Sequence, residues 1–166
     1  MNAELLYKKM LEALRLRAQQ GAFEIAGLAI GGAWIAERLA QDLGLPHFGV
    51  INVAFHRDDY AEKGMTALRT ASTMTTHLPF DVNGANVILI DDVLFTGRTV
   101  RAALNELFDF GRPAKVELMV LADRGHRELP VCANFVGETT VVSDDQILVL
   151  QKNDAGQFDF VLEERE

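Results

Sequence analysis

Two adjacent acids, Asp91 and Asp92, and the short loop that follows them are the residues of this chain best suited to chemistry. They come directly after an apolar run at residues 87–90, which predicts a buried strand. The next residues, Thr-Gly-Arg-Thr at 96–99, open a helical pattern, and a helix N-terminus offers a phosphate unpaired N–H groups and a partial positive charge. Because carboxylates suit the hydroxyls of a ribose, the stretch predicts a site for a phosphorylated sugar.

The stretch at residues 87–99 resembles the signature by which type I phosphoribosyltransferases bind phosphoribosyl diphosphate (PRPP). That signature is an apolar strand, two acids, a short turn and Thr-Gly-x-Thr. The resemblance implies that Asp91 and Asp92 are catalytic, hold the ribose hydroxyls and contact Mg²⁺. The alternative is an ordinary strand-to-helix turn with Thr96 or Thr99 as the N-cap and both acids solvated. The PRPP-binding residues implied by the resemblance are Val93, Leu94, Phe95, Thr96, Gly97, Arg98 and Thr99.

Three further stretches, at residues 57–59, 111–113 and 123–130, resemble the pyrimidine operon regulators, a family whose members are also uracil phosphoribosyltransferases. The resemblance implies transfer of the phosphoribosyl group from PRPP to uracil, which gives UMP and pyrophosphate. It also implies a homodimer or a higher homo-oligomer. The alternative is an RNA-binding attenuator that responds to UMP and UTP, binds an mRNA leader and has weak or no transferase activity. A nucleotide sensor, or another phosphoribosyltransferase with purine specificity, is a third hypothesis.

The loop at residues 123–130 corresponds in that family to the hood that covers the base. Simpler roles stay open for its charged side chains: Arg124 and Arg127 can serve RNA, or pair with the acids at 123 and 128. A lone histidine in a loop is more often structural than a general base, although it titrates near neutrality. The base-binding residues implied by the resemblance are Asp123, Arg124, Gly125 and His126.

Two segments are expected to contact the pyrophosphate. Residues 56–77 lack periodicity and correspond to the family's flexible loop, so they predict a lid. In this lid Arg57 is expected to be a catalytic residue that meets the pyrophosphate; the alternative is that it pairs with a neighbouring acid. The turn at residues 28–33 is Leu-Ala-Ile-Gly-Gly-Ala, where family members usually carry a basic or hydroxyl-bearing residue. PRPP binding at Gly31 and Gly32 is therefore expected from backbone amides, which glycine lets approach an anion.

The composition of the chain narrows the cellular compartment and the binding partners that are expected for the protein. The chain has 166 residues, of which 49% are hydrophobic, enough for one domain with a sizeable core. Its 16 basic and 24 acidic residues give a net charge of −8, which disfavours non-specific nucleic-acid binding as the main task. The lone Cys132 is expected to be buried as a small apolar residue. No apolar run reaches membrane-spanning length and no signal peptide is recognised, so a cytoplasmic protein is expected.

Periodicity predicts the elements that position these residues. The expected fold is α/β, with a doubly wound, mainly parallel sheet, helices on both faces and a small hood from residues 123–166 of a single domain, 1–166. The predicted site then lies at the carboxyl edge of the sheet. Helices are predicted over residues 3–20, 34–43 and 100–108. Strands are predicted over residues 23–30, 48–55, 87–90, 115–121 and 131–136, with weaker ones over 147–151 and 158–162.

Overall fold

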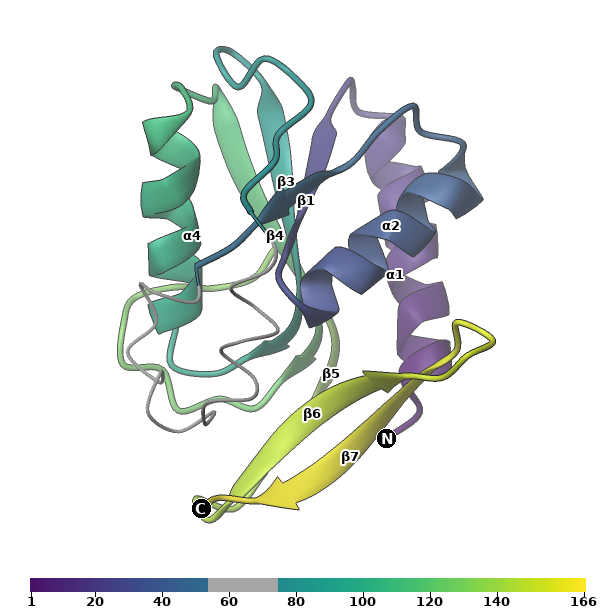
Figure 1. Ribbon diagram of the computed structural model, residues 1–166, viewed down its shortest axis with the longest axis vertical. Helices are drawn as coiled ribbons and strands as arrows, with labels where there is room; N and C mark the ends of the chain where they lie inside the picture. Colours follow the sequence, from purple (N-terminus) through teal and green to yellow (C-terminus); the bar gives the residue numbers. More distant parts are fainter. Residues whose placement is uncertain (54–74) are drawn as a thin grey trace.

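The structure, a computed structural model, describes residues 1–53 and 75–166. In this part of the chain five strands form a parallel sheet in the order β2-β1-β3-β4-β5, and an antiparallel hairpin, β6–β7, stands apart from it (Figure 1). The mainly parallel sheet predicted from the sequence is confirmed. The strands are β1 (Glu24–Leu28), β2 (Gly49–Ile51), β3 (Asn86–Leu94), β4 (Lys115–Asp123), β5 (Phe135–Thr139), β6 (Gln146–Lys152) and β7 (Phe158–Glu164).

Strand β3 lies at the centre of the sheet, between β1 and β4. Its side chains alternate between two cores: Ile88 and Ile90 face one side, and Val87 and Leu89 face the other. All four are at most 1% exposed. A strand covered on both faces needs apolar residues at every position, which explains the uninterrupted run in the sequence.

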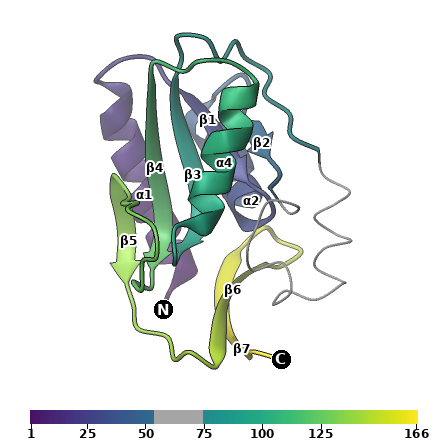
Figure 2. The same cartoon turned by 90° about the vertical axis from the view of Figure 1, so that its left-hand side faces the viewer.

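Helices cover both faces of this sheet, as predicted. Helices α1 (Ala3–Ala18) and α2 (Gly31–Leu43) pack on one face, and α4 (Arg98–Asp109) packs on the other (Figure 2). The N-cap of α4 is Gly97, at φ +93°, and it makes no side-chain cap hydrogen bond. The alternative in which a threonine caps this helix is therefore wrong.

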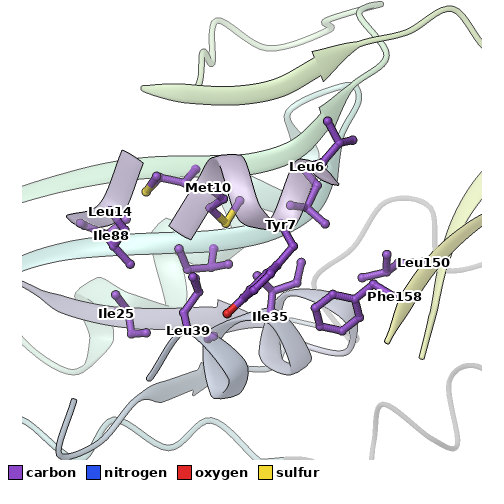
Figure 3. Close-up of a cluster of buried hydrophobic side chains, with 14 of the residues drawn as sticks. Leu6, Tyr7, Met10, Leu14, Ile25, Ile35, Leu39, Ile88, Leu150 and Phe158 are labelled. Atoms are coloured by element: carbon purple, nitrogen blue, oxygen red, sulfur yellow. The ribbon is translucent and has the colours of Figure 1, made fainter. Parts of the chain in front are cut away.

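Aromatic contacts and a hydrogen bond hold the β6–β7 hairpin against α1 and α2. Leu150 and Phe158 enter the core between the helices (Figure 3), and Phe158 meets the Tyr7 ring edge-on with centroids 5.7 Å apart. Glu4 accepts the Phe158 amide at 2.6 Å and both terminal nitrogens of Arg38 at 2.7 and 2.9 Å. The Arg38 guanidinium holds the pKa of the Glu4 carboxyl below its ordinary value. One face of the hairpin is thereby fixed against α1 and α2.

Two expectations are wrong in the segment before β5. The strand begins at Phe135 rather than at residue 131, because the Asn134 side chain accepts the Leu118 amide at 2.9 Å and ends the regular ladder there. Cys132 is exposed rather than buried, because its neighbours Val131 and Ala133 pack against the core. Strand β5 also joins the main sheet, so only the loop before it and the hairpin after it stand apart.

Smaller differences concern where the other elements end. Helix α1 ends at Ala18, β1 spans Glu24–Leu28, and β2 is only three residues long within the described range. In the described residues, no helix is both long and apolar enough to cross a membrane.

Candidate functional site

Three loops meet at the carboxyl edge of the sheet, as the sequence predicted. They follow β1, β3 and β4, which are neighbours in the order β2-β1-β3-β4-β5. In such sheets ligands bind where the strand order reverses, here between β1 and β3. The turn after β1 touches the end of β3, because a Cβ at Gly31 would overlap the Asp92 carboxylate, whose Cγ lies 2.8 Å from that position. The Ala29–Ile30 peptide in this turn is cis.

The two acids point to opposite faces of the sheet, because consecutive side chains alternate in a strand. Asp92 is half-buried and faces the turn at Gly31, where α2 begins. Asp91 is 6% exposed, and its Oδ1 accepts the Asp92 amide at 2.9 Å. The acids therefore flank β3 rather than lie side by side, a geometry that their adjacency in the sequence did not indicate.

The loop at residues 95–99 presents backbone amides at the start of α4. Within residues 1–53 and 75–166, the amides of Thr96, Gly97 and Thr99 have no hydrogen-bond acceptor, whereas the Arg98 amide donates to Thr96 Oγ1 at 3.2 Å. A phosphate at this helix start can accept such amides and gains from the positive end of the helix. The loop thus has the donors that its resemblance to a phosphate-binding signature requires.

The loop after β4 holds the loop at residues 95–99, the predicted phosphate loop, in place. The carbonyl of Thr96 accepts the amides of Glu128 at 2.9 Å and Leu129 at 3.1 Å. The Arg98 side chain pairs with the Glu128 carboxylate at 3.1 Å. Residues 123–130 therefore brace the loop at 95–99 through both backbone and side chains.

The Arg127 guanidinium links the loop after β4 to the loop after β3. This guanidinium donates to both oxygens of Asp123, at 3.0 and 2.6 Å, and to the carbonyls of Phe95 at 2.6 Å and Val131 at 2.9 Å. The Arg127 guanidinium, helped by the Gly125 amide, holds the pKa of the Asp123 carboxyl below its ordinary value against the opposing effect of burial. The pairing of Arg127 with Asp123 considered from the sequence is confirmed, and Glu128 pairs with Arg98.

Two guanidinium groups and one imidazole ring lie around the Phe95 ring. The buried Arg124 guanidinium lies 3.9 Å from the ring centroid, the Arg165 guanidinium lies 6.0 Å from it, and His126 meets it edge-on at 6.3 Å. His126 has a φ of +56°, which is uncommon outside glycine. The preceding Gly125, at +72°, makes the sharp reversal of the chain possible. The sequence analysis missed Arg165, since nothing local connects the chain end to this loop.

The predicted lid at residues 56–77 lies mostly outside the described residues, and Arg57 is among the positions that lie outside. The described end of the segment runs beside strand β2. His77 and Val50 exchange backbone hydrogen bonds of 2.8 and 2.9 Å there. The role of Arg57 stays a prediction.

Two known proteins are similar in sequence to most of this chain. The chain is 51% identical over 158 residues to the "Bifunctional protein PyrR" of Ralstonia nicotianae, an alignment that covers 93% of this chain and 88% of the relative. It is 41% identical over 164 residues to the protein of the same name from Nitrosococcus oceani, which covers 95% and 90% of the two chains.

Solved structures show the same fold at lower identity. The hypoxanthine phosphoribosyltransferase of Trypanosoma cruzi matches all of this chain and 95% of its own with a TM-score of 0.61 at 16% identity. A purine phosphoribosyltransferase from Pyrococcus horikoshii matches 81% of this chain and 80% of its own with a TM-score of 0.55 at 23% identity. The family description "Phosphoribosyl transferase domain" matches residues 2–151. The chain therefore belongs to the phosphoribosyltransferase family.

Proposed function

We propose that this phosphoribosyltransferase transfers the phosphoribosyl group of PRPP to uracil. In this step the bond between C1 of the ribose and the diphosphate oxygen breaks, and its electron pair leaves with pyrophosphate. N1 of uracil forms the new bond to C1 and releases its proton to water, which gives UMP. The positive charge that builds on the ribose and the negative charge on the leaving group both need stabilisation by the site.

The observation that carries this proposal is the contact between the three loops. Gly31 lies against Asp92, and the carbonyl of Thr96 is held by the amides of Glu128 and Leu129. A ligand bound where these loops meet reaches a half-buried carboxylate and a set of backbone donors at once. PRPP carries the matching groups: a 5′-phosphate for the amides and ribose hydroxyls for the carboxylate.

Mg²⁺ fits this site as a companion of the diphosphate. Among the described residues no group of three or more His, Cys, Asp or Glu side chains is placed to hold an ion. That suits Mg²⁺, which keeps several waters and binds phosphate oxygens together with one or two carboxylates. We assign Asp92, which faces the turn at Gly31, as the carboxylate nearest to the ion. When bound, the ion neutralises charge on the diphosphate.

The base is assigned from the loop after β4. This loop bears the eight residues that resemble the pyrimidine operon regulators, and the relatives at 51% and 41% identity are named PyrR. Uracil offers alternating donors and acceptors, which backbone groups near Gly125 and His126 can match. Because both oxygens of Asp123 are occupied by Arg127, its side chain has a bracing role.

The test is transfer by the purified chain with PRPP, Mg²⁺ and one of three bases: uracil, guanine or hypoxanthine. UMP formed from uracil is expected, with at least a tenfold loss in Asp92→Asn and none in Asp109→Asn, whose exposed acid lies at the far end of α4. Removal of Mg²⁺ by a chelator should stop the reaction. Nucleotide from a purine and none from uracil contradicts the base, and no nucleotide from any base contradicts the transfer.

RNA binding is a second proposed function, favoured by the word "bifunctional" in the names of the relatives. Two basic residues of α1 already form ion pairs with acids of this chain: Arg15 pairs with Glu12, and Arg17 pairs with Glu117. The proposal predicts binding to a pyrimidine-operon leader that UMP strengthens and salt weakens. Equal binding to a scrambled RNA contradicts it.

A further inference from the structure

The turn at residues 28–33, here called the pyrophosphate turn, lacks the positive charge that the proposed transfer requires. No residue from 28 to 33 carries a charge, yet the leaving diphosphate bears several negative charges. The N-terminus of α2 supplies the equivalent of only about half a positive charge. Another element has to bring a cation to this turn if the leaving group is to be neutralised by the protein.

The β6–β7 hairpin brings a cation, Lys152, close to the first turn of α2. Lys152 is the last residue of β6 and pairs with Phe158 across the hairpin. Side chains alternate along a strand, so Lys152 lies on the same face as Leu150, and in an antiparallel pair it shares that face with Phe158. Leu150 and Phe158 point from the hairpin into the core formed with α1 and α2 (Figure 3). Lys152 is thereby directed toward the same helices.

The aromatic contact of Lys152 fixes which end of α2 it reaches. Its Nζ lies 5.2 Å from the centroid of the Trp34 ring, within the range of a cation–π contact. Trp34 is three residues after Gly31, so the two positions lie on neighbouring parts of one helix face. Side chains on a helix also lean toward its N-terminus. The ammonium group therefore lies beside the ring of Trp34, a residue in the first turn of α2.

This is an unusual place for an unneutralised cation. The positive end of a helix repels a lysine, and an anion bound there would reverse the sign of the interaction. Within the described residues Lys152 has no carboxylate in ion-pair range, and its contact is with the face of Trp34. Lys152 is exposed, so its long stem can turn from the ring toward a ligand at the turn.

We propose that Lys152 binds the diphosphate of PRPP and the pyrophosphate product, and so supplies the cation that the turn at residues 28–33 lacks. This inference rests on the proposed transfer. As the C1–oxygen bond breaks, the charge that accumulates on the leaving pyrophosphate faces the Lys152 ammonium. Trp34 holds that ammonium at the start of α2 until the ligand arrives.

The chain provides its own probe, because Trp34 is its single tryptophan. Titration of the protein with magnesium pyrophosphate, without uracil, should change the Trp34 fluorescence as Lys152 moves to the anion. The variants are Lys152→Met, which keeps the apolar stem, Lys152→Arg, which keeps the charge, and Lys9→Met, an exposed control on α1. Kinetics with PRPP and uracil follow for each variant.

Loss of one charge-assisted contact predicts that Lys152→Met weakens pyrophosphate binding and raises the KM for PRPP by about tenfold. The KM for uracil should not change, and Lys152→Arg should restore most of the affinity. The inference is overturned if Lys152→Met binds pyrophosphate within twofold of Lys9→Met. Pyrophosphate binding is measured without a base, so a protein that binds it through Lys152 but forms no UMP contradicts only the proposed transfer to uracil.

Discussion

Arg127 should be the side chain on which the shape of the phosphate loop most depends. The perturbation is Arg127→Met, which keeps much of the stem and removes the guanidinium. Asp123 then loses both of its contacts with Arg127, and the carbonyls of Phe95 and Val131 lose the donor that Arg127 provides. The change acts on the loop after β4 and, through Phe95, on the loop after β3.

The size of the effect follows from burial. Removing one partner of a fully buried ion pair costs about 3–5 kcal/mol, and an exposed pair contributes about 0–1 kcal/mol. The side chains of Arg127 and Asp123 are 24% and 16% exposed, which places this pair nearer the buried limit. We expect Arg127→Met to lower the free energy of unfolding by about 2–4 kcal/mol. For a chain of this length, a loss of about 3 kcal/mol corresponds to a Tm lower by about 6–12 °C.

The assay is urea unfolding of the wild type, Arg127→Met, Asp123→Asn and the double variant, together with the KM for PRPP. Arg15→Met is the matched control, because Arg15 is 50% exposed and its pair with Glu12 spans 3.4 Å; its effect should stay within about 0.5 kcal/mol. The two single changes should be non-additive by about 1 kcal/mol or more. If Arg127→Met unfolds like Arg15→Met and binds PRPP as the wild type does, the bracing role is refuted.

Two further predictions concern Asp92 and Asp123. Gly31→Ala places a methyl group on the Asp92 carboxylate and should lower kcat/KM for PRPP by about 100-fold. Steady-state kinetics check this against Gly84→Ala, a glycine with open space around it in the turn before β3, at the opposite edge of the sheet, and equal activities would contradict it. Because the pKa of Asp123 is lowered from its ordinary value of 3.8, its pairing with Arg127 stabilises the fold above that pH and is lost as the pH falls through the lower native pKa. Urea midpoints measured from pH 6 down to pH 3 should fall less steeply in Asp123→Asn than in Asp109→Asn, and parallel curves would speak against the linkage.

The sheet could be predicted from the sequence because its signals are local. The run at residues 87–90 has an apolar residue at every position and is flanked by polar residues, a pattern typical of a strand buried on both faces. The meeting of three loops at one edge then follows from the parallel topology itself. The start of β5 could not be predicted in the same way, because it depends on the hydrogen bond from the Leu118 amide to the distant Asn134 side chain.

The geometry of the candidate site could not be predicted from the sequence. Adjacency of Asp91 and Asp92 suggested paired carboxylates, whereas the alternation of the strand separates them to two faces. Lys152 contacts Trp34 and Arg165 contacts Phe95 only through the docking of the hairpin, and the paired residues are 118 and 70 positions apart in the sequence. No periodicity or spacing within a local window carries information about such contacts.

The structure explains in physical terms why few sequences would fit at residues 123–130. The loop must reverse sharply, which takes a left-handed residue at Gly125. It must present two consecutive amides to the carbonyl of Thr96, and it must fix a guanidinium between Asp123 and the carbonyl of Phe95. Each demand restricts a different position, so few sequences satisfy them together. In the proposed function this loop covers the base and also shapes the phosphate site, so one structural element acts on both substrates.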